Sequence, residues 1–307
     1  MITTAALSQT QRDAARELLD AVTAHDGVAP LDEAARLALT GDSAQHLLLP
    51  AGPEHSTDPG ADPAAAETLL GYASLLPDGT VQGMVHPGHR RRGHGTALLR
   101  AALELRPDAG VWAHGALDGS LAFLTAAGMH ETRRLLTLRR ELAAGDPVRD
   151  VAVPTLEDFR LDSFDLERDA DRWVEVNALA FADHPEQGSL GRADLDRRLA
   201  EPWFDAGDLL VALQHEELVG FVWIKRDAAE GPEADAEIYV VATAPSVQGH
   251  GVAGYLLAAA LRRLQAAGVP GVELYVEADN TAALRLYEAW GFTVSGRDVQ
   301  MRAAAKA

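Results

Sequence analysis

The chain has 307 residues, long enough for two domains of about 150 residues each. Hydrophobic residues make up 47% and charged residues 24%, a balance that is typical of globular proteins and excludes wholesale disorder. The formal charge of −19 argues against a non-specific nucleic-acid binder, which needs cations to displace counterions from phosphates. The absence of cysteine excludes disulfides, thiolate metal sites and cysteine nucleophiles.

The sequence shows neither an export signal nor a membrane segment. Residues 1–13 lack the basic start and the apolar core of a secretory signal. No run of about 18 apolar residues is present that could cross a bilayer. We therefore expect a cytoplasmic protein with no membrane partner, and the acidic charge argues against a nucleic-acid partner. We also expect a monomer.

An internal repeat is the most informative feature of the sequence. Each half runs in the order strand, glycine-rich loop, helix, strand, helix, glycine and strand. In the first half we expect these elements at residues 81–87, 90–95, 96–105, 110–113, 121–127, 128 and 132–140. In the second half they fall at residues 237–241, 248–253, 254–267, 272–277, 281–290, 291 and 293–301. Gly93 and Gly251 are 158 residues apart, which is about one domain length, so two copies of one fold are expected.

The two copies should be joined near residues 143–153, where Gly145 and Pro147 interrupt helix and strand patterns alike. We expect an N-terminal domain at residues 1–142 and a C-terminal domain at residues 154–307.

Each copy opens with a helical pattern, at residues 9–25 and at residues 167–180, before its strands begin. A stretch rich in Pro and Gly, residues 50–63, predicts a surface loop inside the first copy. Strands with interspersed helices make the fold class mixed α/β.

The glycine-rich loops are candidate anion sites. N–H groups at a helix start are unpaired, and the helix dipole adds positive charge there. Glycine lets a phosphate approach closely and permits positive φ. In the first copy Arg90, Arg91 and Arg92 add charge to the loop. Either loop alone also fits a flexible turn before a helix, but the repetition at equivalent positions favours an anion site.

Two other kinds of site fit the sequence less well. Residues 249–254 match the Gly-x-Gly-x-x-Gly dinucleotide fingerprint, but that motif should follow its strand directly, and here residues 242–247 intervene. His86, His89 and His94 suggest a metal site, yet the three arginines among them would repel a cation. We expect no metal.

Two motifs resemble those of a known superfamily. Arg90-x-x-Gly93-x-Gly95 and Gln248-x-x-Gly251-x-Ala253 are similar to the pyrophosphate loop of the GNAT-type N-acetyltransferases. Asn280, Tyr287 and Gly291-Phe292 resemble its second motif, in which a helical tyrosine precedes a Gly-Phe turn. The resemblance covers essentially the whole chain as a tandem pair. It implies two acyl-CoA N-acyltransferase domains, each with a mixed, mostly antiparallel sheet flanked by helices, and up to one acetyl-CoA per domain.

A narrower resemblance is to the mycothiol synthase family, found in actinobacteria, which acetylates the cysteinyl amine of a cysteinyl-glucosaminyl-inositol. The His-Pro-Glu-Gln-Gly run that ends at Gly188 is its most specific part, because it lies outside any superfamily-wide motif. The matching stretches are residues 28–30, 85–87, 181–188, 203–205, 237–241 and 274–280.

The resemblance implies a set of acetyl-CoA contacts in both copies. In the first copy these are Gly83, Met84, Val85, Arg91, Arg92, Gly93, His94, Gly95 and Thr96. In the second copy they are Val241, Ala242, Thr243, Gln248, Gly249, His250, Gly251, Val252, Ala253, Gly254, Asn280 and Arg285. Gly249 and His250 stand where many relatives carry basic side chains, so we expect the first copy to bind its acetyl-CoA more tightly.

Acetyl transfer from a thioester to an amine requires two proton movements. An ammonium with a pKa near ~8 must lose a proton before it attacks, and the departing thiolate is helped by a proton donor. The resemblance implies that Glu237 is the general base and Tyr287 the general acid. Either residue alone also fits a structural role, as a solvent-facing carboxylate or a core tyrosine.

The first copy lacks both groups. Counting back eleven positions from Gln248 gives Glu237, and the same count from Arg90 gives Gly79. The position that matches Tyr287 is Leu124. We therefore expect the first domain to bind acetyl-CoA or to act as a scaffold, and the second to perform the chemistry.

The resemblance also implies contacts with the acceptor at Glu33, Glu186, Lys225, Glu237 and Tyr275. Lys225 is one of only two lysines in the chain, although an exposed solubilising lysine is an equal alternative.

The sequence thus predicts a mycothiol-synthase-type acetyltransferase that uses acetyl-CoA. The alternatives are an N-acetyltransferase for another small amine, such as an aminoglycoside or an amino acid, and an acyl-CoA-binding module. A peptide N-terminal acetyltransferase fits less well, because nothing in the acidic composition favours a protein partner.

Overall fold

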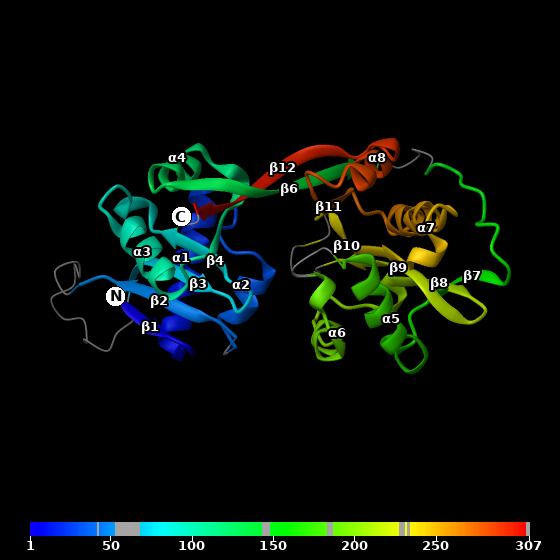
Figure 1. Ribbon diagram of the computed structural model, residues 1–307, viewed down its shortest axis with the longest axis horizontal. Helices are drawn as coiled ribbons and strands as arrows, with labels where there is room; N and C mark the ends of the chain where they lie inside the picture. Colours follow the sequence, from blue (N-terminus) through cyan, green and yellow to red (C-terminus); the bar gives the residue numbers. More distant parts are fainter. Residues whose placement is uncertain are drawn as a thin grey trace. The chain divides into compact units, whose positions relative to one another are not determined.

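The computed structural model describes residues 1–41, 43–52, 68–142, 148–182, 187–226, 231 and 234–304. Contacts divide the chain into two compact units (Figure 1). Unit 1 consists of Met1–Leu135 together with Gly296–Ala307, and unit 2 of Leu136–Ser295.

Unit 1 is a sheet with helices on both faces. Its strands are β1 (Ile2–Thr4), β2 (Gln45–Pro50), β3 (Leu69–Leu75), β4 (Thr80–Val85), β5 (Gly110–Ala113), the first part of β6 (Met129–Glu141) and most of β12 (Thr293–Ala303). They lie in the order β1-β2-β3-β4-β5-β12-β6, and β4–β5 is a parallel pair. The helices are α1 (Gln9–Asp26), α2 (Glu33–Ala38), α3 (His94–Leu105) and α4 (Asp118–Ala126).

Unit 2 repeats this plan. Its strands are the rest of β6, β7 (Phe159–Ser163), β8 (Leu209–Gln214), β9 (Glu217–Lys225), β10 (Ala236–Thr243) and β11 (Gly271–Glu277). They lie in the order β6-β11-β10-β9-β8-β7, and here β10–β11 is a parallel pair. The helices are α5 (Leu166–Ala180), α6 (Arg192–Leu199), α7 (Val252–Ala266) and α8 (Thr281–Ala289).

The predicted mixed α/β class is confirmed, and the elements expected in each copy are present within a few residues of their expected bounds. The expectation that each copy opens with a helix was wrong. β1 precedes α1, and β7 precedes α5. Both are short edge strands, too brief for a period-two pattern to be recognised in the sequence. Most of the expected loop at residues 50–63 lies outside the described residues, as do residues 143–147.

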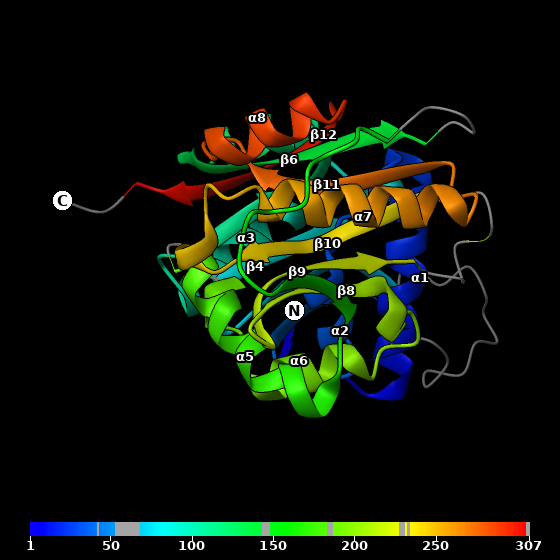
Figure 2. The same ribbon diagram turned by 90° about the vertical axis from the view of Figure 1, so that its right-hand side faces the viewer.

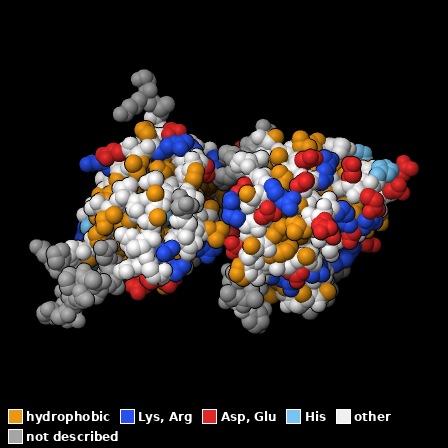
Figure 3. Space-filling model, turned by 90° about the horizontal axis from the view of Figure 1, so that it is seen from below, with side chains coloured by type: hydrophobic (Ala, Val, Ile, Leu, Met, Phe, Trp, Pro, Cys, Tyr) orange, Lys and Arg blue, Asp and Glu red, His pale blue; other side chains and the backbone are white. Residues whose placement is uncertain are grey.

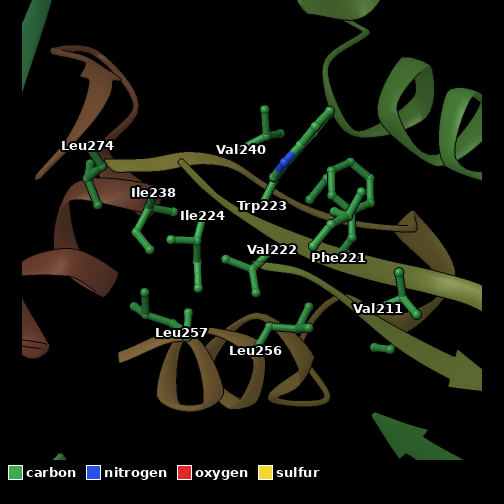
Figure 4. Packing of buried hydrophobic residues seen from close by; sticks show 14 of the residues in the cluster. Val211, Phe221, Val222, Trp223, Ile224, Ile238, Val240, Leu256, Leu257 and Leu274 are labelled. Carbon is green, nitrogen blue, oxygen red and sulfur yellow. The ribbon is translucent and has the colours of Figure 1, made fainter. Parts of the chain in front are cut away.

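Strand alternation places a different core on each face of the unit 2 sheet. Leu256 and Leu257 of α7 pack on Val222, Ile224 and Ile238 (Figure 4). The opposite face carries α5 and α6 (Figure 2), where Trp173 of α5 contacts the rings of Phe221 and Trp223 at 4.9 and 5.8 Å between centroids. Successive β9 residues therefore serve opposite cores, as the two-residue period of a strand requires.

In unit 1 the C-terminal strand completes the sheet. Val299, Gln300 and Met301 of β12 pair with β5 in an antiparallel ladder. Val299 and Met301 are 2% and 4% exposed and belong to the same core as Leu98 and Leu99 of α3. The last strand of the sequence is thus part of the hydrophobic core of the unit that contains the first residue.

Met301→Ala should lower the free energy of unfolding by about 2–5 kcal/mol, because it leaves a cavity in that core. Urea unfolding, followed by circular dichroism, measures the change. Val294→Ala is the control on the same strand, since Val294 is 61% exposed and should tolerate the truncation. Equal stabilities of the two variants would contradict the assignment of Met301 to the core.

Candidate functional site

The parallel strand pair of unit 2 holds together for only two residues. Ala236 pairs with Val272 and Glu237 with Glu273, and beyond this point β10 and β11 form no further ladder pairs. On its other side β10 stays paired with β9 as far as Thr243. The residues after Glu237 therefore have backbone groups on one edge that are not used by the sheet, at an opening between two strands.

Several predicted site residues meet at this point. Residues paired across neighbouring strands project from the same face, and Glu237 pairs with Lys225 on β9 and with Glu273 on β11. Two residues further along β11, the Tyr275 hydroxyl donates to Glu273 Oε1 at 3.2 Å. The structure thus brings together Glu237, Lys225 and Tyr275, three of the five expected acceptor contacts. Glu273, which the sequence analysis did not single out, joins them.

The glycine loop of unit 2 has the geometry of an anion site. Gly249 and Gly251 have φ of 78° and 82°, and a Cβ at either position would meet no atom within 4 Å. Gly251 caps α7, and its carbonyl accepts the first helical hydrogen bond, from Tyr255 N at 3.0 Å. The N–H groups of residues 252–254 thus have no partner within the helix. They form the positive end of a 15-residue helix.

Unit 1 repeats the loop residue by residue. Gly93 caps α3 with φ 85°, and its carbonyl accepts from Ala97 N at 3.0 Å. Arg91 has φ 63°, a left-handed conformation that its counterpart Gly249 shares. A short 3-10 helix precedes each loop, at Pro87–His89 and at Pro245–Val247. The two loops are therefore the same structure with different side chains.

A cavity of about 910 Å³ opens beside the loop of unit 1. It is lined by the loop, by both parallel strands and by α1 and α4, all within unit 1. Eight of the nine acetyl-CoA contacts expected in this copy line the cavity, namely Gly83, Met84, Val85, Arg91, Gly93, His94, Gly95 and Thr96. Arg92 is exposed and does not line it.

One of the three loop arginines is engaged by the protein itself. Arg90 donates to both carboxylate oxygens of Asp26 at 2.8 and 2.7 Å, and to Val85 O at 3.1 Å. The Arg90 guanidinium holds the pKa of Asp26 below its usual value. The charge of Arg90 thus fastens the loop to the end of α1, and the unit 2 counterpart, Gln248, carries no charge. Of the three loop arginines expected to attract phosphate, Arg90 is thus neutralised by Asp26, and Arg91 and Arg92 are left for that role.

Tyr287 lies on α8 and is 8% exposed. Its ring stands edge-on to Phe292 of the Gly-Phe turn, at 5.7 Å between centroids. Burial raises the pKa of Tyr287 to about 12, because the phenolate would lose its hydration. The hydroxyl therefore keeps its proton throughout the physiological pH range, which suits a proton donor.

The remaining predicted residues have separate surroundings. Asn280 caps α8, since its side-chain oxygen accepts from Ala283 N at 3.1 Å. Arg285 on the same helix is exposed. Glu33 is the first residue of α2 in unit 1. Glu186 lies outside the described residues.

The His-Pro-Glu-Gln-Gly run is anchored at its described end. Asn177 of α5, fully buried, donates to Gln187 O at 2.7 Å and accepts from Gln187 Nε2 at 2.9 Å. A Cβ on Gly188 would stand 2.1 Å from Phe181 O, so glycine is required there. These two contacts explain the Gln and the Gly at the described end of the run.

The unit 1 counterpart of Glu237 is Thr80, one residue beyond the expected Gly79. Ile238 and Val240 pair with the consecutive residues Ile224 and Trp223, so Tyr239 is an extra residue in β10. The ladder of β4 has no such bulge. An ungapped count therefore slips by one residue, but unit 1 still offers no carboxylate at this position.

The fold matches solved GNAT structures. A GCN5-related N-acetyltransferase from Sphaerobacter thermophilus has a TM-score of 0.65 at 22% identity, covering 98% of this chain and 94% of its own. A tandem GNAT protein from the clavulanic acid biosynthesis pathway has a TM-score of 0.59 at 24% identity, covering 79% and 81%. The profile of the Acetyltransferase (GNAT) family matches residues 173–292, most of unit 2.

A curated relative decides the family. The mycothiol acetyltransferase of Brachybacterium faecium is 64% identical over 328 aligned positions, which cover 99% of both chains. The chain belongs to the mycothiol acetyltransferase family. As a member of this family it is a GNAT-type acetyltransferase, and the predicted tandem fold is confirmed.

On the face of this mycothiol acetyltransferase family member that Figure 3 shows, Lys and Arg side chains are interspersed with Asp and Glu. Among the described residues, no group of three or more His, Asp or Glu is arranged to hold a metal ion. No helix in the described part of the chain is both long and apolar enough to cross a membrane.

Gly93→Glu and Gly251→Glu form a matched pair that tests the two loops. Each places a carboxylate where a phosphate would approach, and each adds the strain of a side chain at positive φ. We expect each variant to lose about 10-fold or more in acetyl-CoA affinity at its own unit, which isothermal titration calorimetry measures. Unchanged binding in both variants would show that neither loop holds the cofactor.

Proposed function

We propose that the protein transfers the acetyl group of acetyl-CoA to the cysteinyl amine of cysteinyl-glucosaminyl-inositol and so produces mycothiol. The observation that carries the proposal is the arrangement in unit 2, where Glu237 stands at the last pair between β11 and β10, the strand that leads to the glycine loop. The full-length similarity to mycothiol acetyltransferases supports the choice of acceptor.

In this proposal the Glu237 carboxylate accepts a proton from the acceptor's ammonium, directly or through one water. The free amine then attacks the thioester carbon. The N–H groups at the start of α7 hold the pyrophosphate, and N–H groups of β10 beyond its last pair with β11 bind the pantetheine arm and the thioester oxygen. Positioning supplies much of the rate, since the thioester is already activated.

Tyr287 donates its proton to the departing thiolate. Its raised pKa keeps the proton available, and the Gly-Phe turn packed on its ring fixes its direction. Lys225 and Tyr275, on the same sheet face as Glu237, bind the acceptor. We propose the same role for Glu33 and Glu186 on the basis of the family resemblance.

The two halves of the sequence, residues 1–142 and 154–307, divide the work in this proposal. The first binds an acetyl-CoA without turning it over, and the cavity of about 910 Å³ supports that role. Thr80 and Leu124 stand at the positions of Glu237 and Tyr287, so this half has neither proton-transfer group. We also propose that the enzyme is a monomer and that it acts in the cytoplasm, where acetyl-CoA is available.

The first experiment incubates the purified protein with acetyl-CoA and cysteinyl-glucosaminyl-inositol and locates the added acetyl group by mass spectrometry. We expect acetylation of the cysteinyl amine. Glu237→Gln should lower kcat by about 10²-fold or more, because it removes the proton acceptor while keeping the shape. Turnover of a different small amine, with none of this acceptor, would favour the alternative N-acetyltransferase.

Tyr287→Phe should lower kcat by about 10-fold or more while the Kd for acetyl-CoA stays unchanged. Since the pKa of Tyr287 is raised to about 12, no basic limb from this residue should appear in the kcat profile below pH 10. The neutral tyrosine also stabilises the fold below its ordinary pKa of about 10, and this contribution is lost as the pH rises through about 12. Intact turnover with weakened cofactor binding would contradict the assigned role.

A further inference from the structure

Lys225 sits in an aromatic cage. Its Nζ lies 5.1 Å from the centroid of the Trp203 ring and 5.5 Å from that of Tyr239. The two rings also contact each other, with centroids 5.2 Å apart and planes inclined by 57°. Both cation distances fall within the ~6 Å at which an ammonium is attracted by the electron-rich face of a ring.

The rings of the cage are fixed from several elements of unit 2. Trp203, which is 9% exposed and follows α6, packs on the fully buried Trp223 at 5.5 Å. The Tyr239 hydroxyl accepts from Arg198 Nε of α6 at 3.0 Å. Arg198 is itself held by a hydrogen bond from Nη1 to Asp194 O at 3.1 Å. Tyr239 is also the bulged residue of β10, so the bulge turns its ring toward the end of β9.

The position of the ammonium matters because of what stands beside it. Lys225 and Glu237 are direct cross-strand partners on the same face of the sheet. A lysine side chain in water samples many rotamers, and a ligand that binds it must select one of them. Aromatic rings attract an ammonium through its charge, and an ammonium carries three N–H groups, so one that is held by rings can also donate to oxygen acceptors.

We propose that Trp203 is a positioning residue for acceptor recognition. Together with Tyr239 it fixes the Lys225 ammonium beside Glu237, where the N–H groups meet hydroxyl oxygens of a polyhydroxyl acceptor. This inference rests on the proposed function. In unit 1 Leu76 lies across from Thr80, where unit 2 has Lys225, and Ser74 pairs with Gln82, where unit 2 has Trp223. Neither Leu76 nor Ser74 is a cation or an aromatic residue, so the cage belongs to unit 2.

The cage can be tested without any assay of activity, because the chain has only two lysines, Lys225 and Lys306. Reductive ¹³C-methylation of the intact protein gives two lysine signals, which the Lys306→Arg variant assigns. We expect the Lys225 methyl signal to be shifted upfield by ring currents, and Trp203→Leu to move it toward the position of a free lysine. Trp173→Leu is the matched control, since Trp173 is fully buried and also packs on Trp223, at 5.8 Å between centroids. An unshifted Lys225 signal in the wild type, or an equal change in both variants, overturns the cage.

The positioning role is tested by kinetics. Trp203→Leu should raise the KM for cysteinyl-glucosaminyl-inositol by about 3- to 10-fold, with kcat and the KM for acetyl-CoA nearly unchanged. Trp203→Phe should restore part of the loss. Trp173→Leu should leave the acceptor KM unchanged even if it lowers the melting temperature as much.

A parallel fall of kcat and rise of both KM values, or the same effect in Trp173→Leu, would show that Trp203 acts only through stability. If the wild type does not acetylate this acceptor, the proposed function fails. The Lys225 signal is then titrated with myo-inositol, and a signal that does not respond overturns the recognition role.

Discussion

The separation of one parallel strand pair is the constraint on which the rest of this structure depends. In unit 1 only Thr80 and Val81 pair with β5, and in unit 2 only Ala236 and Glu237 pair with β11. Past these pairs, each sheet must leave backbone groups for something else to bind, since buried N–H and C=O groups need partners. The loop and the helix start that follow each diverging strand then place backbone N–H groups at the open end. A fold that closed this gap would lose the proposed cofactor site and the opening beside Glu237.

The two units share one strand arrangement and differ in a few side chains at the point where the parallel strands separate. At the last parallel pair, before the strands separate, unit 2 carries Lys225, Glu237 and Glu273. The corresponding positions in unit 1 are Leu76, Thr80 and Gly110. Unit 1 keeps the loop and has a large cavity, but Thr80 and Leu124 stand where unit 2 has Glu237 and Tyr287. Retention of the loop without the proton-transfer groups is consistent with a unit that binds but does not react.

Local features of this protein could be predicted from its sequence, and features that depend on tertiary contacts could not. The positive φ of Gly93 and Gly251, and the start of a helix directly after each of them, could be predicted because both properties depend on neighbouring residues in the sequence. The engagement of Arg90 by Asp26 joins residues 64 positions apart, and no pattern near Arg90 indicates it. The bulge at Tyr239 displaced an ungapped count by one residue, because buried and half-buried residues alternate without a break along β10 and the pattern gives no sign of an extra residue. Glu273 and the ring of Trp203 became part of the site only when strand register and loop packing were known.

The position of β12 has a consequence for how the chain is made. Residues 1–135 leave the ribosome first, yet the strand that covers β5 is at the end of the sequence. With synthesis at roughly 5–20 residues per second, the 160 residues of unit 2 separate these two events by roughly 8–30 seconds. During this interval the edge of β5 and the apolar side chains beneath it are exposed in the nascent chain, as a hydrophobic surface that can aggregate or recruit a chaperone. Unit 2 therefore has time to fold before β12 can complete the sheet of unit 1.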